Sequence, residues 1–157
     1  ASLVDVMIGN EEDFTESLGF EVKGLDENYS NLSTGPFKEM VEKVAAEYPN
    51  LQIIATTLRK VHSASDNDWG AIAWSRTDGF FEVPPLPNLE IFDRVGGGDS
   101  FASGLIFGLL EGRSLLDSLK LGQAHGAIAM TTPGDTSMAT KSEVEKLASG
   151  GSARVIR

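Results

Sequence analysis

The clearest pattern of apolar positions lies between Pro36 and Tyr48. The apolar side chains recur at three- and four-residue spacing and form one stripe of a helix, namely Phe37, Met40, Val41, Val44, Ala45 and Tyr48. Pro36 suits the first helical turn, because a residue there needs no backbone N–H donor, and Pro49 with Asn50 ends the element. The spacing therefore predicts an amphipathic helix that begins at Pro36 and covers a core with one face.

Short apolar runs precede and follow this helix. Residues 3–8 and residues 51–56 are typical of buried strands, and the order strand, helix, strand is the unit of a parallel α/β sheet. Asn10 is a good N-cap for a short helix that we expect to end near Leu18. Residues 21–35 are polar and lack periodicity, so we expect a loop there.

The second half of the chain combines a hairpin with helices. Residues 70–75 and 79–83 have strand character, and the Thr77-Asp78-Gly79 turn between them is a hairpin signal. We expect a loop over 59–69 and a connecting segment over 83–88, since prolines supply no donor to a central strand. The remaining expected elements are a brief extended segment at 89–92 and helices over 100–110, 115–131 and 142–149. The prediction is one α/β domain.

The composition is that of a globular domain with an excess of acid. The chain has 157 residues, 41% hydrophobic, and its 13 Lys and Arg stand against 23 Asp and Glu, which gives a formal net charge of −10. This charge argues against general nucleic-acid binding and against an anionic membrane surface as partners. The absence of cysteine fits a reducing compartment such as the cytoplasm.

The first residues contain no basic region ahead of an apolar run, so we do not expect a signal peptide, and no run reaches the roughly 18 apolar residues of a membrane span. The chain opens at once on a predicted strand. We therefore expect a fragment or one half of a larger fold.

A run of three glycines precedes an apolar helix. Gly96, Gly97 and Gly98 are costly to order, but they would leave bare N–H groups at a helix N-terminus, which attracts phosphate. A carboxylate at Asp99 would repel a phosphate that is merely held. It is useful if it takes a proton from an attacking hydroxyl while the neighbouring amides hold the charge of a transferred phosphoryl group. A tight glycine turn with Asp99 as an ordinary N-cap explains the same residues, so both interpretations stay open.

Other nucleotide-binding and hydrolase signatures are missing from the sequence. It contains no Walker A loop, no G-x-G-x-x-G at 96–101, no G-x-S-x-G and no H-E-x-x-H. His62 and His125 lie in unrelated segments, and we expect His125 to be packed or capping rather than a metal ligand. Asn10 and the acids at 11–13 are a second candidate, because an amide and carboxylates after a strand can hold Mg²⁺ through water; from this segment alone, helix capping is the simpler explanation.

The stretch Asp93-Arg-Val-Gly-Gly-Gly-Asp99 and the residues up to Gly104 resemble the C-terminal signature of the ribokinase-like (PfkB) sugar kinases, D-[TR]-x-G-[AG]-G-D. Similar segments extend the resemblance over nearly the whole chain, at residues 9–14, 55–60, 62–72 and 125–134. The resemblance implies a ribokinase-like three-layer α/β/α fold, of which this chain would be the C-terminal half without the lid over the sugar. It also implies a kinase that uses ATP and Mg²⁺.

The resemblance assigns roles by position. Asp99 would be the catalytic base, Gly96, Gly97 and Gly98 the anion hole, and Asn10 and Asp13 the region near Mg²⁺ and the phosphates. The residues expected near the nucleotide are Thr57, Leu58, Arg59, Lys60 and Gly70, with Gln123 and Gly126 near the adenine. Two positions depart from the family pattern. Asp13 stands where Glu is usual and reaches less far, and Arg59 stands where many relatives have Gly and could contact a phosphate.

The phrases TTLR, HSAS, NDWGAI and TTPGDTSMAT look most like those of bacterial 2-keto-3-deoxygluconate kinases. This implies transfer of phosphate from ATP to a hydroxyl of that sugar acid. Another sugar kinase of the family, such as ribokinase or fructokinase, stays open, because the acceptor contacts would lie in the missing half. A further alternative also stays open: the chain is an inactive nucleotide-binding fragment that needs a partner chain or forms a homo-oligomer. Half of a sheet exposes an unpaired edge and an apolar face, which favours such association.

Overall fold

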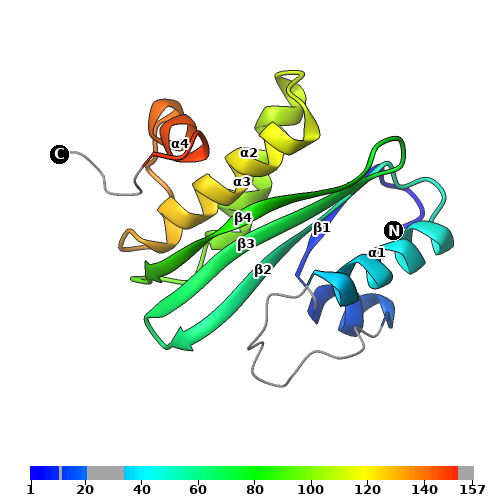
Figure 1. Cartoon of the computed structure of the whole chain (residues 1–157), viewed down its shortest axis with the longest axis horizontal. Coiled ribbons are helices and arrows are strands. Elements are labelled where there is room, and N and C mark those ends of the chain that lie inside the picture. The colour runs from blue at the N-terminus through cyan, green and yellow to red at the C-terminus, as the bar shows by residue number, and fades with distance from the viewer. Residues whose placement is uncertain (11, 21–33, 152–157) are drawn as a thin grey trace.

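The structure is a computed structural model, and it describes residues 1–10, 12–20 and 34–151 (Figure 1). The elements in these ranges are β1 (Val6–Gly9), the π-helical segment η1 (Asp13–Ser17), α1 (Gly35–Glu47), β2 (Ile53–Ser63), β3 (Asp66–Ser75), β4 (Gly79–Glu90), α2 (Gly97–Leu110), α3 (Leu115–Met130) and α4 (Lys141–Ala148). Within the same ranges, no helix has the length and apolar character needed to cross a membrane.

The four strands form one sheet in the order β1-β2-β3-β4. β1 runs parallel to β2, with Val6 opposite Ile53, and α1 lies between them in the sequence, which confirms the predicted strand–helix–strand unit. β2, β3 and β4 are antiparallel neighbours, so the sheet is mixed. Figure 1 shows β2, β3 and β4 as long twisted strands, with β1 along one edge.

The sheet buries side chains on both faces, because successive residues of a strand point to opposite sides. One buried cluster joins the small side chains of Ala55, Ala71 and Ala73 to α2 and α3. The other joins Ile54 and Ile72 to the apolar stripe of α1. Helix α1 thus covers one face while α2 and α3 cover the other (Figure 1), which confirms the expected three-layer α/β/α arrangement.

Residues 59–69, predicted as a loop, instead extend two strands. β2 continues to Ser63 and β3 begins at Asp66, with Arg59 opposite Trp69 in the pairing. The end of β2 from Arg59 onward is mostly exposed, so it lacks the alternation of buried and exposed side chains that marks a strand in a sequence. Pairing with the backbone of β3, rather than side-chain burial, holds this segment extended.

The segment 83–88, predicted as a connection, belongs to β4. Pro84, Pro85 and Pro87 supply no N–H donor, but in the described part of the chain β4 is an edge strand whose partner, β3, lies on one side alone. The register between β3 and β4 also shifts on either side of Trp69, which faces this part of β4. An edge position therefore accepts the prolines that a central strand would reject.

The other predicted elements have counterparts in the structure. The hairpin joins Ser75 of β3 to Gly79 of β4, and the three C-terminal helices form as α2, α3 and α4. The helix expected after Asn10 takes the π-helical form of η1. Most of the loop predicted over 21–35 lies outside the described residues, at 21–33.

Helices α2 and α3 pack closely because glycines of α2 face the backbone of α3. A Cβ on Gly104 would lie 2.6 Å from the carbonyl oxygen of Leu121, and one on Gly108 would lie 2.6 Å from Oγ of Ser118. No larger residue fits at either position without moving a helix. This close packing fixes the N-terminus of α2 relative to α3 and the sheet.

Candidate functional site

The glycine run turns the chain from the sheet into α2. The N–H groups of Phe92 and Asp93 donate to the carbonyl oxygen of Met130 at 2.9 and 3.3 Å, which anchors the start of the loop at the end of α3. Gly96 then adopts a φ of +83°, in the left-handed region that favours glycine, and its carbonyl accepts the N–H of Ser100 at 2.9 Å. Helix α2 begins at the next residue.

The backbone amides at the start of α2 are open to a ligand. The N–H of Gly97 makes one long bond of 3.4 Å to the carbonyl of Arg94, and the N–H groups of Gly98 and Asp99 have no acceptor among the described residues. A Cβ on Gly98 would meet no atom within 4 Å, so the space in front of this glycine is open. Free amides in a first helical turn, with no side chain before them, attract an anion.

A pocket of about 180 Å³ lies at this helix start. Five residues to which the family resemblance assigned a role line it together, and they come from the position after β1, from β2 and from α2: Asn10, Thr57, Arg59, Gly97 and Gly98. Glu12, Trp69, Arg94 and Met130 complete the lining. The fold therefore brings segments that are about 40 residues apart in sequence to one site, as an α/β sheet does at the ends of its strands.

Arg94 and Trp69 line the pocket but were not singled out by the sequence patterns. An Nη of Arg94 donates to the carbonyl of Ala64 at 2.8 Å, which ties the glycine loop to the β2–β3 turn. Trp69 is 6% exposed, and its indole N–H donates to the carbonyl of Gln123 at 3.2 Å. A basic residue inside the glycine motif of an acidic chain is the signal by which Arg94 could have been identified from the sequence. The sequence carries no such signal for Trp69, because it lies in the segment predicted as a loop.

The pocket concentrates positive charge in an acidic chain. Within the described part of the chain, neither Arg59 nor Arg94 forms an ion pair with a carboxylate. A guanidinium group offers a fork of N–H donors that matches two phosphate oxygens. With Glu12 as one acidic wall, the site has the chemistry of an anion pocket rather than of a cation pocket.

Asp99 is exposed in the first turn of α2. Its carboxylate has no hydrogen bond or ion pair to any described residue, and it follows the open Gly98 directly. The N-cap of α2 is Gly96, and no side chain caps the helix, so Asp99 does not serve as the ordinary N-cap that the sequence left open. An unengaged carboxylate beside free amides is available to accept a proton.

Asn10 and Asp13 cap each other. The N–H of Asn10 donates to Oδ2 of Asp13 at 2.8 Å, and the N–H of Asp13 donates to Oδ1 of Asn10 at 2.9 Å. In the part of the chain that the structure describes, no three His, Asp or Glu side chains gather as a metal site. An ion here would therefore meet these two residues through water or through the phosphates of a ligand.

The other residues expected near the nucleotide lie around the pocket rather than in its lining. Gln123 is 6% exposed, and its Nε2 donates to the carbonyls of Trp69 and Pro84 at 3.0 and 2.8 Å. A Cβ on Gly126 would lie 2.9 Å from the carbonyl oxygen of Gly97, so this glycine lets α3 approach the start of α2. Both residues therefore hold the elements around the pocket in place without lining it.

Three further candidates lie on the opposite face of the sheet. Leu58 packs in the cluster beneath α1, and Gly70, its partner in β3, shares that face. Lys60 follows Leu58 by two residues and lies on the same side by the alternation of the strand.

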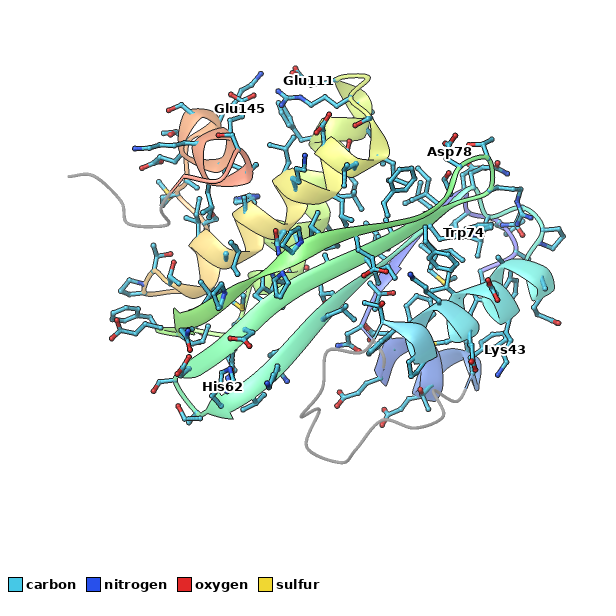
Figure 2. The ribbon with its side chains drawn as sticks, viewed as in Figure 1. Lys43, His62, Trp74, Asp78, Glu111 and Glu145 are labelled. Carbon is cyan, nitrogen blue, oxygen red and sulfur yellow. The ribbon has the colours of Figure 1, made fainter. Side chains whose placement is uncertain are left out.

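The two histidines are far apart. His62 lies near the turn of the β2–β3 hairpin (Figure 2), where its Nε2 is 2.9 Å from Oδ1 of Asp68. The N–H of Asn88 and the ring of His62 both hydrogen-bond Asp68 and hold the pKa of its carboxyl below the ordinary value. His125 is half-buried in α3, as expected for a packed residue, and its Nε2 lies 2.9 Å from Oγ of Ser137.

The sequence and the fold both match known sugar kinases. The family model for pfkB family carbohydrate kinases matches residues 1–142. The 5-dehydro-2-deoxygluconokinase of Clostridium beijerinckii is 35% identical over 63 residues, which are 40% of this chain and 18% of that protein. The 2-dehydro-3-deoxygluconokinase of Bacillus subtilis is 46% identical over 46 residues, which are 29% of this chain and 14% of that protein.

A solved structure extends the likeness over almost the whole chain. The 2-dehydro-3-deoxygluconokinase of Thermotoga maritima superposes with a TM-score of 0.83 at 35% identity, covering 95% of this chain and 43% of that one. The chain thus spans less than half the length of the relatives that it matches. By its sequence from residue 1 to residue 142 and by its ribokinase-like fold, the chain belongs to the pfkB family of carbohydrate kinases.

Proposed function

We propose that this chain is the C-terminal, ATP-binding part of a kinase that phosphorylates a hydroxyl of 2-keto-3-deoxygluconate, the sugar acid also called 2-dehydro-3-deoxygluconate. Family membership supports the kinase chemistry, and the likeness to two 2-dehydro-3-deoxygluconokinases supports the acceptor. The observation that carries the proposal is the open start of α2, where free amides adjoin the unengaged carboxylate of Asp99. With ATP as donor and no cysteine in the chain, we place the reaction in the cytoplasm.

Each group at the site has a part in phosphoryl transfer. Asp99 takes the proton of the acceptor hydroxyl, whose oxygen forms a bond to the γ-phosphorus of ATP as the bond to the ADP oxygen breaks. The amides of Gly97, Gly98 and Asp99 hold the charge on the transferred group. Arg59 and Arg94 bind the phosphate chain from the other walls of the pocket.

Mg²⁺ fits this site as an ion held mainly by the nucleotide. It would neutralise charge on the β- and γ-phosphates, and Asn10 and Asp13 would reach it through water, because their facing oxygens already accept each other's N–H groups.

Replacing Asp99 by Asn tests the assignment of the base. The amide keeps the shape of the side chain but cannot accept the proton, so single-turnover transfer from MgATP in the natural full-length polypeptide should fall about 10²- to 10⁴-fold. Binding of MgATP, followed by calorimetry, should change little. Near-normal turnover would reject Asp99 as the base.

A panel of acceptors tests the substrate. We expect 2-keto-3-deoxygluconate to have the highest kcat/KM, ahead of 5-dehydro-2-deoxygluconate, ribose and fructose. A preference for ribose or fructose would keep the kinase chemistry and reject the sugar acid.

A second possibility is that this chain alone only binds nucleotide and needs further polypeptide to act. Two observations favour it. Among the residues that the structure describes, β1 has a strand neighbour on one side alone, and α2 exposes the large apolar side chains of Ile106, Phe107 and Leu110, the last at 83%. Size measurement of the chain in solution, combined with a kinase assay, separates the two. A compact monomer with good kinase activity would exclude a need for a partner.

A further inference from the structure

His125 of α3 contacts the segment that follows α3 and lies near the start of α2. Its Nε2 lies 2.9 Å from Oγ of Ser137, in the stretch between α3 and α4. The backbone of Ser100, in the first turn of α2 and next to Asp99, lies near the ring. The side chain is half-buried. One imidazole therefore connects the start of α2 with the segment that follows α3.

The hydrogen-bond partners define the state of this ring. Oγ of Ser137 accepts the N–H of Ala139 at 3.2 Å, which leaves the hydroxyl proton free for Nε2 of His125. When that hydroxyl donates to Nε2, the neutral ring carries its proton on the other nitrogen. Burial lowers the pKa of His125 and outweighs the opposite effect of the Ser100 backbone, which favours this neutral form.

The charged groups around the ring are already paired. His125 shares a pocket of about 200 Å³ with Lys141 and Glu145 of α4 and with Ser103 and Phe107 of α2. Lys141 forms an ion pair with Glu111, and Glu145 one with Arg113; Figure 2 shows both carboxylates on the side of the molecule where α2 ends and α4 lies. Among the described residues, none of these charged groups hydrogen-bonds the ring in place of Ser137.

The segment that His125 holds supports the glycine loop directly. The carbonyl oxygen of Asp135, two residues before Ser137, lies so close to Gly96 that a Cβ there would be 2.1 Å away. Met130, at the end of α3, lies against Gly97, where a Cβ would be 2.7 Å from its Cγ. The direction of the amides that follow Gly96 therefore depends on the position of residues 130–137.

We propose that His125 is a positioning residue, which acts with Ser137 to hold residues 131–138 against Gly96 and thereby aims the amides of Gly97, Gly98 and Asp99. It contacts neither nucleotide nor acceptor. The effect of this positioning on phosphoryl transfer rests on the proposed function. The effect of this positioning on the geometry and mobility of the glycine loop does not.

Hydrogen exchange of the natural full-length polypeptide tests the positioning role without any assay of catalysis. Ser137→Ala removes the partner of Nε2 and should speed exchange of the hydrogen-bonded amides of Ser100, Thr131 and Thr132 about fivefold or more. Ser103→Ala, which removes a hydroxyl from the same pocket with no hydrogen bond to a described residue, should leave those rates unchanged. Ser137→Thr keeps the hydroxyl and should restore slow exchange.

A double-mutant cycle then identifies His125 as the partner. His125→Asn and Ser137→Ala should each weaken binding of tripolyphosphate about threefold to tenfold, and the double variant should be no weaker than the worse single one. If His125→Asn fails to fold, the difference in amide exchange between Ser137→Ala and Ser103→Ala still tests the positioning role. Equal exchange rates at Ser100, Thr131 and Thr132 in those two variants, or fully additive effects in the cycle, would overturn the proposal.

Kinetics separate this proposal from the proposed function. With an active kinase, Ser137→Ala should lower kcat more than it raises KM for ATP, because misdirected amides stabilise the transition state less. A wild-type polypeptide that transfers no phosphate, yet shows the expected exchange differences, would reject the proposed function and leave the positioning role in place.

Discussion

Three consecutive glycines at the candidate site meet three different requirements. Gly96 has a φ of +83° and lies against the carbonyl of Asp135, so it needs glycine for its backbone conformation and for space. Gly97 lies against the side chain of Met130. Gly98 faces open space. Of the three, Gly98 is the position at which a side chain would disturb a ligand without disturbing the fold.

Gly98→Ala should therefore separate binding from stability. We expect the free energy of unfolding to stay within about 1 kcal/mol of the wild type, because alanine is the better helix former and meets no neighbour. The added methyl group would stand in front of the free amides and should weaken binding of MgATP about tenfold or more. Urea unfolding and calorimetry measure the two quantities.

Gly96→Ala is the matched control. It should unfold the chain or cost several kcal/mol, roughly the cost of a strained backbone plus a steric overlap. A Gly98→Ala variant with wild-type affinity for MgATP would contradict the placement of phosphate at these amides.

His125 should make stability depend on pH. Burial holds its pKa below the ordinary value of 6.5, so the folded chain binds this proton less tightly than the unfolded chain does. As pH falls through about 6.5, the unfolded state takes up the proton first and the folded state loses stability. Urea unfolding between about pH 8 and pH 5 should show this loss, and His125→Gln should make the curve flatter. Parallel curves for the two proteins would show that His125 does not titrate differently on folding.

At the scale of elements, helices were the easier part to predict. The stripe of α1 repeats with the helical period and is buried as expected, because an amphipathic helix needs one apolar face and carries that face in its own sequence. The strands were harder. The outer part of β2 and the proline-rich part of β4 show no alternation, and they are strands because β3 pairs with both.

Gly104→Ala tests how strictly the α2–α3 contact requires glycine. In a free helix this change would stabilise by about 1 kcal/mol. Here the Cβ would lie 2.6 Å from the Leu121 carbonyl, so the helices must separate, and we expect a net loss of about 1–3 kcal/mol in urea unfolding. Ser103→Ala, one residue earlier and exposed, should cost less than about 0.5 kcal/mol. Equal stability of Gly104→Ala and the wild type would show that the helices can adjust.

At the scale of the whole molecule, charge is distributed so that an acidic chain can present a basic pocket. The net charge of −10 repels a nucleotide at long range. Within the described residues, several acids are neutralised by cations far from the pocket, as Glu111 and Glu145 are by Arg113 near the other end of α2 (Figure 2). Arg59 and Arg94 are left without carboxylate partners beside the free amides.

The variants Arg94→Gln and Lys43→Gln separate the effect of charge in the pocket on MgATP binding from the effect of the net charge of the chain. Both remove one positive charge, but Arg94 lines the pocket, whereas Lys43 lies on the outer side of α1 (Figure 2). Loss of a charge-assisted hydrogen bond should weaken MgATP binding about tenfold in Arg94→Gln, while Lys43→Gln should stay within about twofold. Calorimetry at two salt concentrations measures both. Equal losses in the two variants would mean that net charge, and not the pocket, governs binding.

The sequence alone determined the elements and residues whose signals are local. The stripe of α1, the glycine run and its aspartate can be identified because helical period, missing side chains and carboxylate chemistry depend on neighbours in the chain. The tertiary structure decided what depends on distant partners. It brought Arg59, Trp69 and Arg94 to the same pocket, directed Leu58 and Gly70 to the opposite face, and set Asp135 against Gly96. Strand pairing and backbone contact act across space, and no short stretch of sequence records them.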